Sequence, residues 1–361
     1  MIYKNPKPHV HSIHAYFPSV VAMDNGEMLA SLVLGEAFES PNCHTHLARS
    51  VDNGETWRIE GPIYPGTKDR LTSDSCRITT FPGGKVVTFM VRSDRTEHPD
   101  EGLTNPENLG FVPTELLLFR SKDYGHSWQG PTALTPPLEG PSFELCSPIV
   151  PLKDGRWLLP TETWPGWDGS CPNGIRMVAF VSYDRGKTWP EYLDVMSEPS
   201  GNVFFWESKI SELPDGRLLA VAWVYDDTVH QDRPNHYAVS KDGGKTWSKP
   251  FSTGLQGQTL TPFLIDDRHI LSVYRRMDQP GLWANVSHLE GDKWVNDGCE
   301  PLWGTTTSGL TTTGKNMAQN FNLLRFGAPC ISRLPDGMFF VAFWCYEDCV
   351  SVIRWFKFLV S

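Results

Sequence analysis

Carboxylate side chains stand beside apolar stretches at several places in the sequence, where they could carry out acid–base chemistry. Glu207 is the clearest case, because it directly follows the apolar residues 203–206 and a buried charge is costly unless it has a partner. Two carboxyl groups, one protonated and one ionised, can together cleave a glycosidic bond. The candidate catalytic residues are Glu207 and, as its partner, Glu144, Glu162 or Asp74.

Arginine and aromatic residues at the ends of predicted strands could bind the substrate of such a site. Arginine binds an acid group through two parallel hydrogen bonds, and aromatic rings can stack on sugar rings. The candidate substrate-binding residues are Arg77, Arg92, Arg275, Arg276, Trp164, Tyr225 and His44. Arg275 and Arg276 are neighbours after a predicted strand, so we expect only one of them to point into the site. Trp164 could instead close the end of a sheet.

Histidines form a second group with possible chemistry. His44 and His46 are two residues apart on a predicted strand, so their side chains share one face. This spacing allows a metal site or a histidine general base, and it also fits ordinary hydrogen bonding within a sheet. We predict no metal and no cofactor.

A repeated pattern must position these residues. The pattern Ser-x-Asp-x-Gly-x-Thr/Ser-Trp occurs four times, at residues 50–57, 121–128, 182–189 and 240–247. A fifth copy at residues 287–294 keeps the Ser, Gly and Trp but has Leu289 and Lys293 at the other two positions. The copies recur roughly every 60 residues, which is typical of a fold built from repeated sheets.

Turn pairs between apolar runs add two strands to each repeat. They are Asn25-Gly26, Gly83-Gly84, Asp154-Gly155, Asp215-Gly216, Asp266-Asp267 and Asp336-Gly337, and Asn-Gly and Asp-Gly favour tight hairpins. A third strand then runs into the repeated pattern and a fourth leaves it. The sequence therefore predicts an all-β, six-bladed β-propeller of four-stranded blades, with residues 1–361 as a single domain.

The last repeat lacks a fourth strand. Its third strand is predicted at residues 350–358, and the repeated pattern does not follow it. We expect residues 10–15 to supply the missing strand, so that the N-terminal strand closes the ring. Pairing the two ends of the chain would also cover edge strands that could otherwise aggregate.

Composition narrows the possible partners and compartment. The 361 residues carry a formal net charge of −10, which argues against unspecific nucleic-acid binding. The apolar runs are shorter than the roughly 18 residues of a membrane span, and residues 1–8 lack the apolar core of a secretory signal. The eight cysteines include no CxxC pair. We therefore expect a cytoplasmic protein with mostly reduced thiols and no membrane partner.

The repeated pattern is the Asp box, and over nearly all its length the chain resembles the sialidase superfamily of propellers. The resemblance implies that the box aspartates are structural. It also implies places for an Arg-Ile-Pro motif, a tyrosine nucleophile, a glutamate and further arginines. Here Tyr16-Phe17-Pro18 stands at the Arg-Ile-Pro place and Ala328 at the nucleophile's place, and residues 221–224 lack the expected arginine. Glu207 alone matches, so we predict no sialidase activity.

These features predict a glycan-processing enzyme of sialidase-like fold. The simplest form is a glycoside hydrolase acting on an acidic sugar, a uronate or a sulfated sugar. A polysaccharide lyase acting on a uronate glycan is one alternative, in which a His or Tyr takes the proton beside a carboxylate neutralised by Arg. A non-catalytic propeller that binds a glycan or a protein is the other alternative. The expected partner is a carbohydrate, and the sequence specifies neither the sugar nor the oligomeric state.

Overall fold

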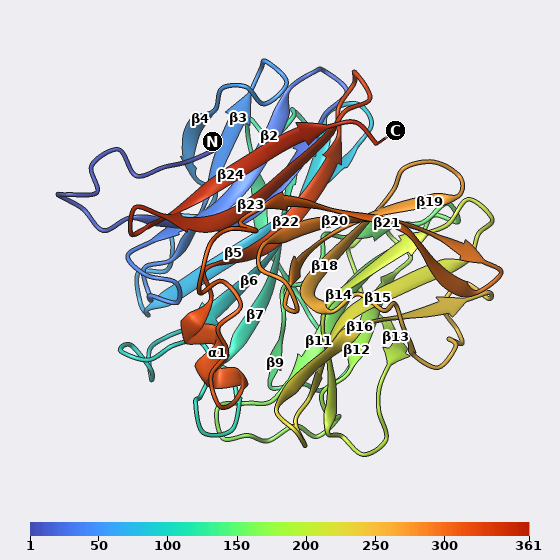
Figure 1. The fold of residues 1–361 in the computed structure, drawn as a ribbon. Helices are drawn as coiled ribbons and strands as arrows, with labels where there is room; N and C mark the ends of the chain where they lie inside the picture. Colours follow the sequence, from blue (N-terminus) through green and yellow to red (C-terminus); the bar gives the residue numbers. More distant parts are fainter. Residues whose placement is uncertain (361) are drawn as a thin grey trace. The chain divides into compact units, whose positions relative to one another are not determined.

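The computed structural model describes residues 1–360, and apart from one short helix its regular elements are all antiparallel strands (Figure 1). The chain divides into two compact units, which are described separately. Unit 1 contains Met1–Asn105, Val112–Leu134 and the residues from Arg325 on, and unit 2 contains Pro106–Phe111 and Thr135–Leu324. The single-domain prediction stays a prediction.

Unit 1 contains three sheets whose strands are ordered as in the sequence. The first comprises β1 (His14–Ala22), β2 (Met28–Gly35), β3 (His44–Ser50) and β4 (Arg58–Pro62). The second comprises β5 (Thr72–Phe81), β6 (Lys85–Asp94), β7 (Thr114–Ser121) and β8 (Gln129–Leu134). The third comprises β22 (Phe326–Arg333), β23 (Phe339–Glu347) and β24 (Val350–Phe358).

Unit 2 contains the other three sheets and a short helix, α1 (Met317–Leu323). The first sheet comprises β9 (Ser142–Phe143), β10 (Val150–Pro151), β11 (Trp157–Trp164), β12 (Met177–Ser182) and β13 (Glu191–Met196). The second comprises β14 (Val203–Glu212), β15 (Leu218–Asp226), β16 (Gln231–Ser240) and β17 (Phe251–Ser252). The third comprises β18 (Gly257–Leu264), β19 (His269–Arg276), β20 (Leu282–Glu290) and β21 (Lys293–Trp303).

These six sheets are the blades of a six-bladed β-propeller, which confirms the predicted fold class. Each predicted turn pair joins two antiparallel neighbours of its sheet, and the six hairpins are β1–β2, β5–β6, β10–β11, β14–β15, β18–β19 and β22–β23. In five of the six turns, all except Gly83-Gly84, an acidic or amide side chain accepts a hydrogen bond from the backbone N–H two residues on. Asp215 Oδ1, for example, accepts from Arg217 N at 3.0 Å, and Gly216 supplies a φ of 86°. The chain thus reverses at the predicted positions.

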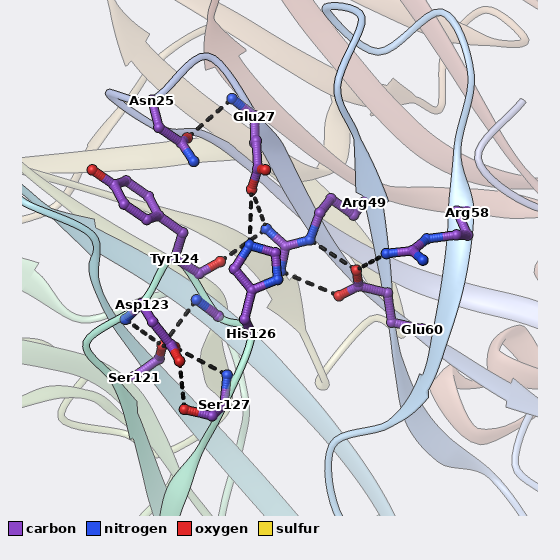
Figure 2. A network of polar contacts seen from close by, with 11 residues as sticks. Asn25, Glu27, Arg49, Arg58, Glu60, Ser121, Asp123, Tyr124, His126 and Ser127 are labelled. Carbon is purple, nitrogen blue, oxygen red and sulfur yellow. Dashed lines mark hydrogen bonds and ion pairs between the residues drawn. The ribbon is translucent and has the colours of Figure 1, made fainter.

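The Asp boxes are compact turns held by their own side chains. In the second box Ser121 Oγ donates to Asp123 Oδ1 at 2.7 Å and accepts from Gly125 N at 2.9 Å. Asp123 in turn accepts from Ser127 N at 3.0 Å (Figure 2). Gly125 has a φ of 81°, which a residue with a Cβ would resist. The fifth copy, in which Leu289 replaces the aspartate, forms a hairpin between β20 and β21 instead.

The N-terminal part of the chain does pair with the last sheet, as predicted, but the predicted residues 10–15 are wrong. Residues 10–13 belong to no strand, and His14 and Ala15 belong to β1. The N-terminal residues that pair with β24 are Ile2 and Tyr3: Ile2 N donates to Ile353 O at 2.9 Å, and Ile353 N donates to Tyr3 O at 3.0 Å. The apolar Ile2 side chain is buried there, whereas Val10 is exposed.

The first strand of four sheets contains a bulge at the same position. The pairing of the first strand with the second shifts register at Tyr16/Ser19, Trp206/Lys209, Gln258/Thr261 and Gly327/Cys330. One residue in each bulge has a left-handed φ of 46–56°, and these residues are Phe17, Glu207, Thr259 and Ala328. Bulges redirect a side chain out of the regular sheet and often lie beside functional sites. Among the residues described, no helix is long and apolar enough to span a bilayer.

Candidate active site

Unit 2 brings three of the four predicted catalytic carboxylates together. Glu144 and Cys146 lie in the irregular stretch between β9 and β10, and Glu162 lies fully buried on β11. Glu144, Cys146 and Glu162 each have one side-chain oxygen or sulfur atom that lies within 4.8 Å of the corresponding atoms of the other two. The irregular stretch is held against β11 because Glu144 N donates to Glu162 O at 3.2 Å and Thr161 Oγ1 donates to Glu144 O at 2.8 Å.

Burial changes the protonation of this group. It raises the pKa of Glu144 well above its ordinary value, and the nearby charges of Glu162 and Glu207 raise it further. Burial also raises the pKa of Glu162, although hydrogen bonds from Cys146 and Ser208 oppose this rise. The hydrogen bond between the two carboxyl groups raises the pKa of Glu144 and lowers that of Glu162, so Glu144 is the group that keeps the proton.

Glu207 lies at the bulge of β14, with a φ of 54°. Lys209 Nζ lies 3.3 Å from Glu207 Oε2, and the same ammonium donates to Glu207 O at 2.6 Å. The bulge is fixed from the other side, because Ser208 N donates to Glu162 Oε1 at 2.7 Å. Glu162 therefore holds the backbone that presents Glu207, and Lys209 forms an ion pair with its carboxylate.

A buried arginine, Arg275, interacts electrostatically with the same glutamate. Arg275, at the end of β19, is 3% exposed, and its Nε donates to Gln258 Oε1 at 2.7 Å. Gln258 Nε2 donates to Asp232 Oδ2 at 2.6 Å, and Trp223 Nε1 donates to Asp232 Oδ1 at 2.7 Å. Burial lowers the pKa of Arg275 to about 10, while the charges of Asp232 and Glu207 favour its protonated form. Unit 2 thus places two cations, Lys209 and Arg275, within electrostatic reach of Glu207.

The neighbouring Arg276 does not join the cluster. Its Nε donates to Asp278 Oδ1 at 2.7 Å, and its guanidinium lies 4.4 Å from the centre of the Trp283 ring. The alternation of side chains along β19 accounts for this difference. Only one of the two adjacent arginines points toward the carboxylates.

The aromatic candidates of unit 2 lie inside the fold. Trp164 and Tyr225 both stack on Trp206, with ring centroids 5.2 and 5.4 Å away. Trp164 Nε1 donates to Leu109 O at 2.6 Å. Both side chains are almost completely buried, so neither offers an open ring face for a sugar. Their visible role is to support Trp206, the residue before Glu207.

The remaining candidates lie in unit 1. Asp74 Oδ2 lies 2.7 Å from His44 Nδ1. Arg92 Nε donates to Glu115 Oε2 at 2.8 Å, and its Nη1 donates to Tyr64 Oη at 3.0 Å. The buried Arg77 donates to the carbonyl of Cys76 at 3.3 Å. Asp74 and His44 thus form a pair, whereas Arg92 already has an acidic partner.

One group in residues 1–360 has the spacing of metal ligands, namely Glu144, Cys146 and Glu162. Metal binding requires ligands that have lost their protons. Burial raises the pKa of all three, and it raises that of Cys146 well above its ordinary value. The structure therefore favours protonated side chains here and supports an acid more than a metal centre. The two strand histidines, His44 and His46, do not belong to this group.

Sequence reasoning missed Cys146, Lys209, Asp232 and Gln258. A spacing could have indicated the first: Cys146 precedes Gly155 by nine residues, as Glu207 precedes Gly216, Phe17 precedes Gly26 and Ala328 precedes Gly337. Lys209 lies just past the bulge, which only the register of β14 with β15 reveals. Asp232 lies on β16 and reaches Gln258 on β18, a contact between blades that no local pattern predicts.

Comparisons with known proteins agree with this architecture. The BNR/Asp-box repeat family matches residues 238–249. A protein of unknown function from Dyadobacter fermentans is 21% identical, with a TM-score of 0.73 over 98% of this chain and 95% of that one. The intramolecular trans-sialidase from Ruminococcus gnavus is 14% identical, with a TM-score of 0.65 over 96% and 94% of the two chains.

The NanB sialidase from Streptococcus pneumoniae is 15% identical, with a TM-score of 0.66 over 100% of this chain and 70% of that one. No curated protein matches the sequence significantly. At these identities the similarity shows the fold, and the chemistry must be argued from the side chains.

Proposed function

We propose that this sialidase-like propeller is a glycan-processing enzyme, a glycoside hydrolase that acts on an acidic sugar and is not a true sialidase. The observation that carries the proposal is the contrast between two neighbouring carboxyl groups. Burial and the neighbouring Glu162 raise the pKa of Glu144 well above its ordinary value, whereas the Glu207 carboxylate forms an ion pair with Lys209 at 3.3 Å. Paired carboxyl groups held in opposite protonation states are the usual arrangement of glycosidases.

The two groups have complementary roles in the proposed reaction. Glu144 donates its proton to the glycosidic oxygen as the bond to the leaving group breaks. Glu207 then either attacks the anomeric carbon or removes a proton from the water that attacks it. Glu162 keeps the proton on Glu144 and holds the Ser208 amide, so it positions both groups.

The preference for an acidic sugar rests on the cations of unit 2. Lys209 and the buried Arg275 both act on Glu207. Guanidinium and ammonium groups beside a catalytic carboxylate would also attract a carboxylate or sulfate of the substrate.

The bulges support the argument against sialidase activity. Ala328 occupies the same position in its strand as Glu207 does in β14, and Phe17 does so in β1. Ala328 has no nucleophile, and neither Phe17 nor Tyr16 provides a guanidinium. A sialic-acid mechanism at these positions would lack the groups that the family resemblance implies, so we expect no release of sialic acid from a fluorogenic sialoside.

Product analysis tests the proposal. The full chain is incubated with 4-nitrophenyl glycosides of neutral sugars and uronic acids, with uronate polysaccharides, and with the fluorogenic sialoside. We expect release of nitrophenol from uronides, or new reducing ends from polysaccharides, without absorbance near ~235 nm. Products absorbing near that wavelength would show a lyase instead. Binding measured by calorimetry without turnover of any substrate would show a binding module and overturn the enzyme proposal.

A further inference from the structure

A histidine and an aspartate form a second acid–base arrangement, in unit 1. His44 begins β3, and its Nδ1 lies 2.7 Å from Oδ2 of Asp74, which lies on β5. The other carboxylate oxygen of Asp74 accepts from Thr45 N at 2.8 Å. The backbone of Asp74 is also fixed, because its N–H donates to Cys43 O at 2.9 Å. The Asp74 carboxylate therefore has a fixed position and is almost completely buried.

This pairing determines the chemistry of the imidazole. A carboxylate can only accept a hydrogen bond, so His44 Nδ1 must carry the proton and Nε2 of the neutral ring has the free lone pair. The His44 side chain is 30% exposed. Within residues 1–360 Nε2 has no hydrogen-bond partner, so it is available to a ligand. The hydrogen bond with Asp74 raises the pKa of His44, against the opposing effect of burial.

The surrounding charges indicate what kind of ligand fits. Asp74 lies opposite Arg92 in the pairing of β5 with β6, and Arg92 lies opposite Glu115 in the pairing of β6 with β7. Arg92 and Arg70 both bind Glu115, and Arg70 also binds Asp94. Arg92 and Arg70 are therefore already neutralised by carboxylates, and neither is an unpaired cation that could bind an anionic group. A neutral hydroxyl compound fits these surroundings better than an acid does.

We propose that His44 is a general acid–base residue and Asp74 its positioning residue, in a site that takes the hydroxyl group of water or of a neutral polyol. Nε2 accepts the hydroxyl proton while the oxygen forms a bond to an electrophilic carbon such as an acyl carbon. The bond from that carbon to its leaving group breaks, and the leaving group departs with the electron pair. The proton on Nε2 then passes to solvent. The Asp–His arrangement holds the imidazole in the tautomer that such a step requires.

The inference goes beyond the proposed function and does not depend on it, since it involves other residues. The probe is 4-nitrophenyl acetate, whose hydrolysis by the full chain is followed as released nitrophenolate. We expect His44→Asn to lower the protein-dependent rate at least about two-fold, above the background of the other histidines. His46→Asn is the matched control, because His46 lies on the same strand and its Nδ1 contacts only the His44 carbonyl, at 3.0 Å. The control should keep the wild-type rate.

Asp74→Asn tests the positioning role through the pH profile. The rate rises as His44 loses its proton, and Asp74 is the titratable group whose charge acts on His44. Removing that charge should therefore move the midpoint of the profile to lower pH. Equal rates in wild type and His44→Asn, or an unchanged midpoint in a folded Asp74→Asn variant, would overturn the inference.

A measurement on the wild-type protein covers the case in which Asp74→Asn does not fold. Nitrogen-15 NMR of the imidazole side chains distinguishes a protonated ring nitrogen from a bare one. We expect His44, assigned by its loss in His44→Asn, to carry its proton on Nδ1 at a pH above its pKa, where the ring is neutral. A proton on Nε2 instead would contradict the proposed dyad.

Discussion

At the scale of single residues, the carboxyl groups of Glu144 and Glu162 in unit 2 make the folded state less stable at neutral pH, because their surroundings favour the protonated form. Glu162 is fully buried, Glu144 is half-buried beside it, and each has a raised pKa. At neutral pH the folded state must either keep a proton that the unfolded chain would lose or bury a charged carboxylate, and both cost free energy. Active sites commonly contain such costly arrangements, because a raised pKa is what allows a carboxyl group to act as an acid near neutral pH.

Glu144→Gln should make the protein more stable at neutral pH. The folded-state pKa of Glu144 lies above its ordinary value of 4.5, so the folded state binds more protons than the unfolded state between these two values. The contribution of Glu144 to the free energy of unfolding is therefore fully present below its ordinary pKa of 4.5 and falls as the pH rises toward its folded-state pKa. Glutamine is neutral at every pH, so it should raise the free energy of unfolding at pH 7.5 by about 1–3 kcal/mol.

Urea unfolding at pH 7.5 and pH 4 measures this effect. The gain in the free energy of unfolding should be smaller at pH 4, where the wild-type Glu144 carboxyl group is protonated in both the folded and the unfolded state. Glu139→Gln serves as the control, because Glu139 is an exposed glutamate that precedes the cluster and should give no gain at either pH. A Glu144→Gln variant that is no more stable than wild type at pH 7.5 would contradict the assigned proton.

At the scale of elements, the boxes and hairpins fix the strands, and side chains between sheets link them. Arg49, on β3, is one of the side chains that link the first two sheets of unit 1. It binds Glu60 through Nε at 2.8 Å and Glu27 through Nη1 at 2.6 Å. The same Nη1 donates to the carbonyl of Tyr124, in the second Asp box, at 2.9 Å (Figure 2). One guanidinium thus satisfies groups from both sheets.

Arg49→Met should destabilise the protein strongly. The Arg49 side chain is 3% exposed, and removing it leaves Glu27 and Glu60 without their buried partner, which should cost about 3 kcal/mol. Arg58→Met is the matched control: Arg58 binds the same Glu60 at 2.9 Å, but its side chain is 77% exposed, so its loss should cost less than about 1 kcal/mol. If denaturant unfolding shows that Arg49→Met and Arg58→Met lower the free energy of unfolding equally, the view that Arg49 links the two sheets is refuted.

At the scale of the whole molecule, the repeats made the fold predictable from the sequence. Four clear boxes and six turn pairs mark the strands, because each box is a local turn whose Ser, Asp and Gly bind one another. The end of the chain was less predictable. Residues 10–15 are the predicted partner, yet Ile2 and Tyr3 pair with β24, and the local sequence pattern does not distinguish the two choices.

The candidate site was partly predictable for a related reason. Glu207 stands out because a charge follows four apolar residues, and Glu144 and Glu162 lie before and after the Asp154-Gly155 turn of the preceding repeat. The contacts that define their chemistry, from Lys209, Ser208 and Gln258, depend on a bulge and on packing between sheets. Such long-range contacts leave no local pattern in the sequence.

The kinetics of Glu207→Gln provide the most direct test of the claim that this propeller is a glycoside hydrolase. The variant is compared with wild type on the uronide that wild type cleaves fastest. We expect kcat to fall by at least about 100-fold, while the control Glu212→Gln, on the same strand but bound to Lys153 N at 2.8 Å, keeps its activity. Full activity of Glu207→Gln would contradict the account.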